Sequence, residues 1–134
     1  MSKVVHVAVG VIVNAQQQIL IALRPDDSHQ GGLWEFPGGK VEQGETVQQA
    51  LIRELQEELG IVAQRFAALT EIHHDYGDKA VHLDVWWVHE FSGEPQGREG
   101  QPLQWLAAAE LSRYDFPKAN QPIIAAVMQS LLPA

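Results

Sequence analysis

The chain has 134 residues, of which 46% are hydrophobic and 19% charged, and its formal net charge is −8. This length and composition predict one globular domain over residues 1–134 with a substantial core. The negative charge argues against binding to nucleic acid polymers or anionic membranes, which needs clustered Lys and Arg, and the lack of cysteine excludes disulfides and thiolate metal sites.

The N-terminal part of the sequence predicts two strands and a loop. Residues 4–13 are nearly all apolar and β-branched, and residues 19–23 form a second such run after a polar turn. Together they predict a hairpin whose first strand is buried on both faces. The first run is too short for a membrane helix and lacks a cleavage site, so we expect no signal peptide and a cytoplasmic location. Residues 26–32 predict a loop, and residues 35–39 a short extended piece ending in a Gly-Gly turn.

A helix of about thirteen residues is predicted in the middle of the chain. Thr46 and Gln49 make a capping box at its start, and Gly60 stands where a C-terminal cap belongs. Leu51 and Leu55 fall on one face of this helix, so that face is expected to pack on a sheet.

The remaining sequence predicts a second hairpin and a terminal helix. Residues 66–74 and 80–91 flank the turn residues 76–78, and apolar and polar residues alternate over residues 81–87 of the second strand. Residues 92–101 predict a polar loop, residues 103–106 an edge strand, and residues 121–132 a helix with a proline in its first turn. These elements predict an α+β fold, a mixed sheet with helices on both sides.

Three glutamates at helical spacing, Glu54, Glu57 and Glu58, share one side of the predicted helix. Like charges at this spacing repel by a few tenths of a kcal/mol per pair. One interpretation is an exposed acidic stripe in which Arg53 pairs with Glu57. The other is a site for a hard cation, because carboxylate oxygens suit Mg²⁺ or Mn²⁺ and a bound ion turns the repulsion into attraction.

The residues ahead of the helix favour the cation site. Gly39 is followed at fixed spacing by Glu45, by Arg53-Glu54-Leu55, by Glu57-Glu58 and by Gly60-Ile61. This pattern, G-x5-E-x7-R-E-U-x-E-E-x-G-U with U a bulky aliphatic residue, matches the signature of the Nudix hydrolases at nine specified positions. The chain therefore resembles that family, whose members use divalent metals to cleave a nucleoside diphosphate linked to another group. The resemblance implies the Nudix α/β/α sandwich, a mixed β-sheet between helices.

The same resemblance implies roles for the residues of this motif, the Nudix box. The Gly38 carbonyl and the carboxylates of Glu54, Glu57 and Glu58 would bind the metal, with Mg²⁺ as the cofactor and Mn²⁺ as a substitute. Glu54 would act as the base that takes a proton from the attacking water, and Arg53 would orient the glutamates.

Three further box residues are assigned structural roles by the resemblance. Glu45 would brace the loop around the helix start, where a carboxylate also suits the helix dipole. Gly39 and Gly60 would shape the two ends of the box.

Stretches outside the box narrow the resemblance to MutT-type members, which hydrolyse 8-oxo-dGTP to 8-oxo-dGMP and pyrophosphate. These stretches are residues 8–10, 35–40, 93–105 and 115–122. The match implies that Glu99 is a fourth carboxylate at the metal; without it, Glu99 would be a solvated loop charge.

The same match makes Asn120 the residue that recognises the base, where the alternative is a helix cap or turn residue. Oxidation at C8 turns guanine N7 from an acceptor into a donor beside the O6 acceptor, and an asparagine amide offers the complementary acceptor and donor. The resemblance also places Arg24 at the phosphates, Phe36 and Gly38 at the base pocket, and Lys79 at the phosphate or base, with the role of its turn left open.

Two other functions stay open at this stage. The chain could be a Nudix hydrolase of a pyrimidine triphosphate or a dinucleotide polyphosphate, or a non-catalytic Nudix-fold module that only recognises a nucleotide. In each case we expect a small-molecule nucleotide partner and a monomer. His73, His74, His82 and His89 show no spacing typical of metal ligands.

Overall fold

The computed structural model describes residues 4–25 and 31–131. Most of the loop predicted at residues 26–32 lies outside the described residues, and so does the last residue of the predicted terminal helix. The strands are β1 (Val4–Ile12), β2 (Gln18–Leu23), β3 (Trp34–Glu35), β4 (Gly38–Lys40), β5 (Val62–Asp75), β6 (Ala80–Ser92) and β7 (Leu103–Ala107). The helices are α1 (Val47–Leu59) and α2 (Gln121–Leu131), with 3-10 turns η1 (Ala108–Arg113) and η2 (Lys118–Asn120).

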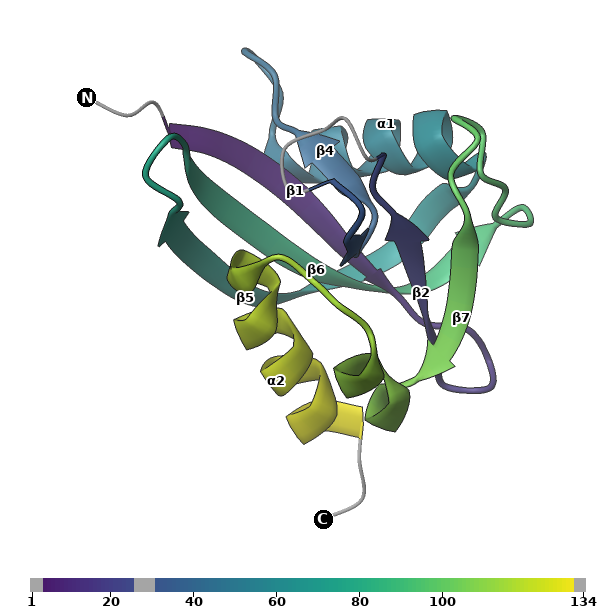
Figure 1. Cartoon of the computed structure of the whole chain (residues 1–134). Coiled ribbons are helices and arrows are strands. Elements are labelled where there is room, and N and C mark those ends of the chain that lie inside the picture. The colour runs from purple at the N-terminus through teal and green to yellow at the C-terminus, as the bar shows by residue number, and fades with distance from the viewer. Residues whose placement is uncertain (1–3, 26–30, 132–134) are drawn as a thin grey trace.

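The strands form two sheets (Figure 1). The larger has the order β4-β1-β6-β5, in which β1 runs parallel to β6 and the other neighbours are antiparallel. The smaller has the order β3-β2-β7 and is antiparallel throughout. The second predicted hairpin is confirmed as β5–β6, and the predicted edge strand as β7, at the edge of the smaller sheet.

Helices cover both faces of the larger sheet, as the predicted fold class requires. Ala8 of β1 packs in one core cluster with Leu51 and Leu55 of α1. Its neighbour Val9 points to the other face and packs in a second cluster with Ile123 of α2. Because successive residues of a strand point to opposite faces, β1 separates the two layers, and Figure 1 shows α1 and α2 on opposite sides of it.

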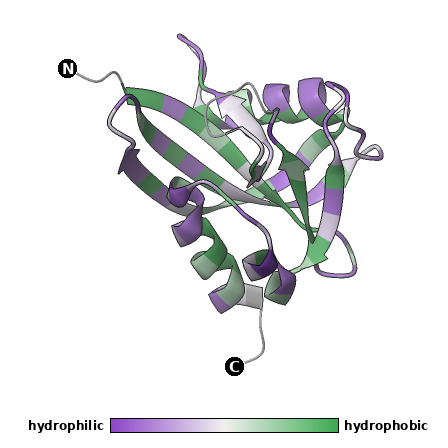
Figure 2. Cartoon of the chain, viewed as in Figure 1, coloured by the Kyte–Doolittle hydropathy of each residue, from purple (hydrophilic) through white to green (hydrophobic). Residues whose placement is uncertain are grey.

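The buried surface follows the hydropathy pattern of the sequence. Figure 2 shows β2 as almost entirely hydrophobic, and its residues Ile19, Leu20 and Ile21 are fully buried. Residues 8–12 of β1 are also buried, which confirms a first strand covered on both faces. Within the described ranges, no helix reaches the length and hydropathy that crossing a lipid bilayer requires.

Helix α1 has the predicted limits and caps. The Thr46 side chain accepts a hydrogen bond from the Gln49 backbone, and the Gln49 side chain accepts one from the Thr46 backbone. Gly60 ends the helix in the left-handed conformation, with φ of 74°, where a β-carbon would be strained.

The predicted hairpin of the first two strands is wrong. β1 and β2 lie in different sheets and are joined only by an isolated bridge between Val13 and Ile19. β6 pairs along the whole of β1, and β4 takes the other edge at Val7–Val9, so a long β1–β2 ladder cannot form.

The predicted Gly-Gly turn is also wrong, because Gly38 and Gly39 lie in strand β4. A β-carbon on Gly38 would collide with the Ala8 carbonyl oxygen of the neighbouring strand. The glycines therefore allow β4 to approach its surroundings closely rather than reverse the chain.

Candidate functional site

Arg53 of α1 connects the helix to the loop and to the strand before it. Its guanidinium donates to both oxygens of the Glu45 carboxylate at 2.7 and 2.9 Å and to the carbonyl oxygen of Lys40 at 3.0 Å. The same guanidinium donates to Glu54 Oε1 at 2.7 Å. Hydrogen bonds from Arg53 and from the Glu42 backbone lower the pKa of Glu45 to about 2. Glu45 thus braces the loop, and Arg53 orients Glu54.

Glu54 lies against strand β4. A β-carbon on Gly39 would collide with the Glu54 carboxyl group, so a glycine at this position leaves the space that the carboxylate occupies. The Glu54 side chain is 16% exposed. The carboxylate is therefore confined between Gly39 and Arg53, but water can still reach it.

Glu58 lies one turn further along α1, beside Gly38 of β4. The Gly38 backbone N–H donates to its Oε2 at 3.2 Å. Burial, followed by the charges of Glu35, Glu54 and Glu99, raises the pKa of Glu58 to about 8. These four carboxyl groups therefore gather at one place, where a positive charge would be strongly stabilised.

Glu99 reaches this group from the loop between β6 and β7. The backbone N–H groups of Gln96 and Arg98 donate to the last carbonyls of α1, at Leu59 and Glu58, with distances of 2.9 and 3.0 Å. The Gln101 side chain donates to the same Glu58 carbonyl at 3.2 Å. Since helix ends leave carbonyls without intrahelical partners, this loop caps α1 and brings Glu99 beside Glu58.

Glu35 is a site residue that the sequence analysis missed. It forms an ion pair with Arg24, at 2.6 Å between Arg24 Nη1 and Glu35 Oε1. Burial raises the pKa of Glu35, the Arg24 guanidinium lowers it, and the charge of Glu99 raises it further. Glu35 falls within the stretch of residues 35–40 that carries the MutT-type resemblance. A single acid in a short extended segment, however, did not indicate that its side chain would join the acidic group.

Glu57 lies on the exposed side of α1, where its carboxylate shares Arg53 Nη1 with that of Glu54. Its side chain is 59% exposed and contacts Arg53 Nη1 at 3.4 Å. It is not among the groups whose charges raise the pKa of Glu58. The structure therefore brings together Glu54, Glu58 and Glu99, and it leaves Glu57 at the rim.

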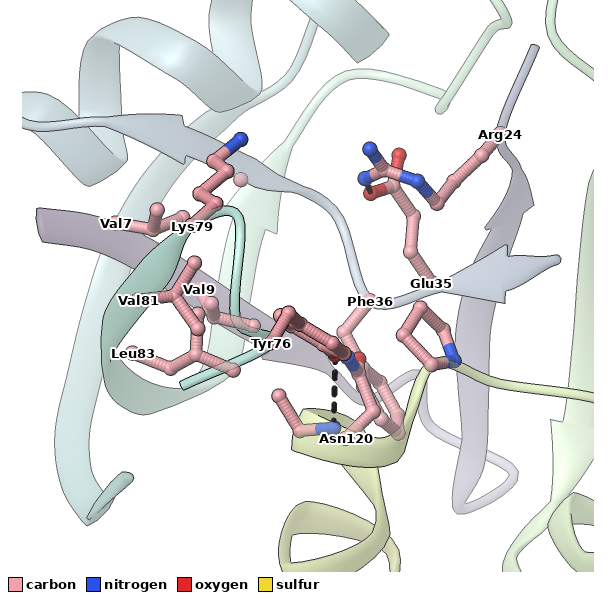
Figure 3. Close-up of a pocket in the computed structure, with 13 residues that line it drawn as sticks. Val7, Val9, Arg24, Glu35, Phe36, Tyr76, Lys79, Val81, Leu83 and Asn120 are labelled. Atoms are coloured by element: carbon pink, nitrogen blue, oxygen red, sulfur yellow. Dashed lines mark hydrogen bonds and ion pairs between the residues drawn. The ribbon is translucent and has the colours of Figure 1, made fainter. Parts of the chain in front are cut away.

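A pocket opens next to these acids, on the α2 side of the larger sheet (Figure 3). Arg24, Phe36, Lys79 and Asn120 line it, so the structure brings the predicted substrate residues together. Phe36 is 3% exposed, and its ring stacks on a buried phenylalanine with centroids 5.3 Å apart, which makes it part of the core as well. In Figure 3, Arg24 lies on one side of the pocket, Lys79 on the other, and Asn120 at the η2 side.

Tyr76 is a second pocket residue that the sequence did not single out. Its hydroxyl accepts a hydrogen bond from the Ala119 backbone N–H at 2.9 Å, drawn as the dashed line in Figure 3. This bond joins the turn of the β5–β6 hairpin to η2, the turn that carries Asn120.

The acidic group beside Glu58 and the pocket of Asn120 are neighbours, and the ion pair between Arg24 and Glu35 lies where they meet. A second pocket is lined by Glu58 and Glu99 together with Arg24 and Glu35. Arg24 and Glu35 also line the pocket that holds Asn120. A molecule that fills both pockets would thus pass over the Arg24–Glu35 pair.

Comparisons with known proteins agree with this arrangement. A family profile described as NUDIX domain matches residues 8–126. The 8-oxo-dGTP diphosphatase of Escherichia coli (strain K12) is 45% identical over 123 residues, covering 92% of this chain and 95% of that protein. The CTP pyrophosphohydrolase of the same organism is 41% identical over 120 residues, covering 90% of this chain and 89% of that protein.

A solved structure shares the fold along nearly the whole chain. A MutT structure from work on Aliivibrio salmonicida and Vibrio cholerae superposes with a TM-score of 0.84 at 43% identity. The match covers 96% of this chain and 99% of that chain. Nudix hydrolases use divalent metal ions, and the gathered carboxylates are the ligands that such ions require. With the family profile over residues 8–126 and these relatives, the chain belongs to the Nudix hydrolase family.

Proposed function

We propose that this enzyme is a Mg²⁺-dependent nucleoside triphosphate diphosphatase that hydrolyses 8-oxo-dGTP to 8-oxo-dGMP and pyrophosphate. The observation that carries the proposal is the pair of adjoining pockets. One holds Asn120 among largely apolar residues, the other is lined by Glu58 and Glu99, and both share Arg24 and Glu35. The substrate has the same order of parts, with a base at one end and a polyphosphate at the other.

The acidic group fits a hard divalent cation. Glu54, Glu58 and Glu99 offer carboxylate oxygens, which Mg²⁺ and Mn²⁺ prefer over nitrogen or sulfur ligands. Burial and the charges of Glu35, Glu54 and Glu99 raise the pKa of Glu58, and a cation bound beside these carboxylates would favour their ionised forms. We assign Glu54, Glu58 and Glu99 to the ion, with the Gly38 carbonyl and the exposed Glu57 as further ligands.

In this proposal the residues of the chain position the substrate and move the proton. Arg53 holds the carboxylate of Glu54, which takes a proton from the water that attacks the β-phosphorus. The bond from that phosphorus to the α,β-bridging oxygen breaks, and 8-oxo-dGMP leaves. Arg24 lines both pockets and would offset the charge of the phosphates, while Lys79 lines only the pocket that holds Asn120 and would contact the base or the nearest phosphate. A bound divalent cation would polarise the phosphoryl oxygens and acidify the water.

Asn120 would select the oxidised base. Its amide oxygen accepts from the N7–H that only the oxidised base carries, while its amide NH₂ donates to O6. With ordinary guanine the amide oxygen would face the N7 lone pair, and both groups would lose a hydrogen bond. A site built around such a bond can reject the analogue by about 10⁴-fold. Phe36 supplies an apolar wall for the base.

A pyrimidine triphosphate is the second candidate substrate, favoured by the relative that is a CTP pyrophosphohydrolase. The acidic group would serve either substrate in the same way. The two candidates differ at the base pocket, where Asn120 gives the argument for the oxidised purine.

The remaining expectations belong to the same proposal. We propose that residues 1–134 act as one domain, since the family profile spans residues 8–126. A monomer is supported by the few large hydrophobic residues exposed in the described chain, namely Val4 and Val62. A cytoplasmic location fits an enzyme that acts on free nucleotides.

A nucleotide panel tests the proposed function. We expect kcat/KM for 8-oxo-dGTP to exceed that for dGTP, CTP, dCTP and diadenosine tetraphosphate, with 8-oxo-dGMP and pyrophosphate as products. In water labelled with oxygen-18, attack at the β-phosphorus places the label in pyrophosphate. A higher kcat/KM for CTP or dCTP would support the second candidate, and label in the monophosphate would contradict attack at the β-phosphorus.

Glu54→Gln tests the proposed base. The amide keeps the shape of the side chain but cannot accept the proton, so kcat should fall by about 10²-fold or more while nucleotide binding persists. Steady-state kinetics and calorimetry with 8-oxo-dGMP measure the two quantities. Glu90→Gln, which changes an exposed glutamate paired with Arg65, is the matched control and should leave kcat unchanged. An unchanged rate in Glu54→Gln would remove this residue from the mechanism.

The raised pKa of Glu58 predicts a pH-dependent affinity for Mg²⁺. The folded metal-free protein holds this proton more tightly than the unfolded chain, so its stability falls as pH rises from 4.5 to about 8. Mg²⁺ needs the ionised carboxylate, so its affinity should rise over the same range and level off above about pH 8. Calorimetric titration with Mg²⁺ measures this slope, and Glu58→Gln should weaken binding and flatten it. A wild-type affinity that does not vary with pH would contradict this assignment.

Asn120→Ala tests base recognition. The variant should lose at least about tenfold in affinity for 8-oxo-dGMP, the value of one or two hydrogen bonds, and much less for dGMP. Gln121→Ala, at the exposed start of α2, controls for effects on the helix end. Equal losses for both nucleotides would mean that Asn120 only shapes the turn before α2.

A further inference from the structure

Three histidines lie side by side on the α1 face of the larger sheet, outside both pockets. His6 of β1 is in register with His82 of β6, which is in register with His73 of β5. The rings of His6 and His82 stack with centroids 4.4 Å apart, and those of His73 and His82 with centroids 4.2 Å apart. The strand pairing thus gathers imidazoles that are far apart in the sequence.

Two carboxylates complete this cluster and fix the orientation of the rings. Asp84 Oδ2 lies 3.2 Å from His6 Nε2, while its Oδ1 accepts a hydrogen bond from Trp86 Nε1 at 3.1 Å. Glu71 Oε1 lies 2.9 Å from His82 Nε2. A carboxylate that holds an imidazole, as Glu71 holds His82, is typical of metal sites, where it sets the tautomer and direction of the ligand.

The two carboxylates also repel one another. Glu71 and Asp84 are direct cross-strand partners in β5 and β6, and like charges in this arrangement destabilise a sheet. Imidazole hydrogen bonds lessen this repulsion, and a cation between the strands would remove it.

The donor atoms are close enough for one ion. One ligand atom from each of His6, His82 and Asp84 lies within 4.8 Å of the others. A tetrahedral zinc ion needs its donors about 3.3 Å apart and in the plane of each imidazole ring. The His6 and His82 rings are stacked with an interplanar angle of 5°, so they would have to turn out of this stack to bind one ion. The three side chains are 36%, 21% and 17% exposed, so an ion can reach them from solvent.

We propose that His6, His82 and Asp84 form a second metal site, which binds a divalent transition ion such as Zn²⁺. Two imidazole nitrogens and one carboxylate oxygen are a donor set that suits zinc and is poor for Mg²⁺. The acidic group beside Glu58 has only oxygen ligands and has the opposite preference. The two sites would therefore bind different ions from the same solution.

The proposed ion would act on the sheet rather than on the substrate. His6 belongs to β1 and the other two ligands to β6, so the ion would join the two strands across their parallel pairing. Its binding to the folded chain alone stabilises that state by mass action. We therefore expect Zn²⁺ to raise the melting temperature.

The test is a Zn²⁺ titration of protein that is already saturated with Mg²⁺, which blocks the acidic group. Calorimetry should find about one tight equivalent, and thermal unfolding should show a higher Tm. His82→Gln should weaken Zn²⁺ binding by at least about tenfold and abolish the rise in Tm. His89→Gln is the matched control, because this exposed histidine of β6 stacks on Trp87 outside the cluster.

Two further measurements keep the outcome decisive. Asp84→Asn preserves the size of the side chain and should also lose Zn²⁺ affinity, which covers the case that His82→Gln does not fold. In NMR spectra, ring signals of His6 and His82 should shift with Zn²⁺ while those of His89 stay. Equal Zn²⁺ binding by the wild type, His82→Gln and Asp84→Asn would overturn the proposal, as would wild-type protein that binds no Zn²⁺.

Discussion

The crowding of negative charge around Glu58 is the constraint on which the rest of the site depends. Glu35, Glu54 and Glu99 all raise its pKa, and burial raises it most. Arg53 is committed to Glu45 and Glu54 and leaves this excess in place. A chain with a net charge of −8 cannot attract a polyphosphate by its own field. The fold therefore concentrates negative charge at one place, where a bound divalent cation would be strongly stabilised.

The parts of this site that depend on local chain geometry were predictable from the sequence. Helix α1 begins and ends where its caps indicate, since capping involves residues within one turn of each other. Its spacing of acids and the motif before it also indicated the metal-binding chemistry. The β5–β6 hairpin was predictable for the same reason, because its strands are joined by a short turn.

The parts that depend on contacts distant in sequence were not predictable. The pairing of β1 with β6 joins residues more than half the chain apart, and it displaces β2 from the edge where a hairpin would form. Glu35 joins the acidic group only because the fold brings it near Glu58, which lies on another element. The histidines show no ligand spacing along the chain because the sheet register alone brings His6 beside His82.

The hydrogen bond from the Ala119 backbone to the Tyr76 hydroxyl holds the pocket of Asn120 together with residues that lie outside the Nudix box. The η2 turn contributes Asn120 but none of the gathered carboxylates. Substitutions in η2 or in the turn of the β5–β6 hairpin can therefore change the shape of this pocket without altering the acidic group beside Glu58. The part of the chain around η2 and the acidic group beside Glu58 can therefore change independently of one another in the course of evolution.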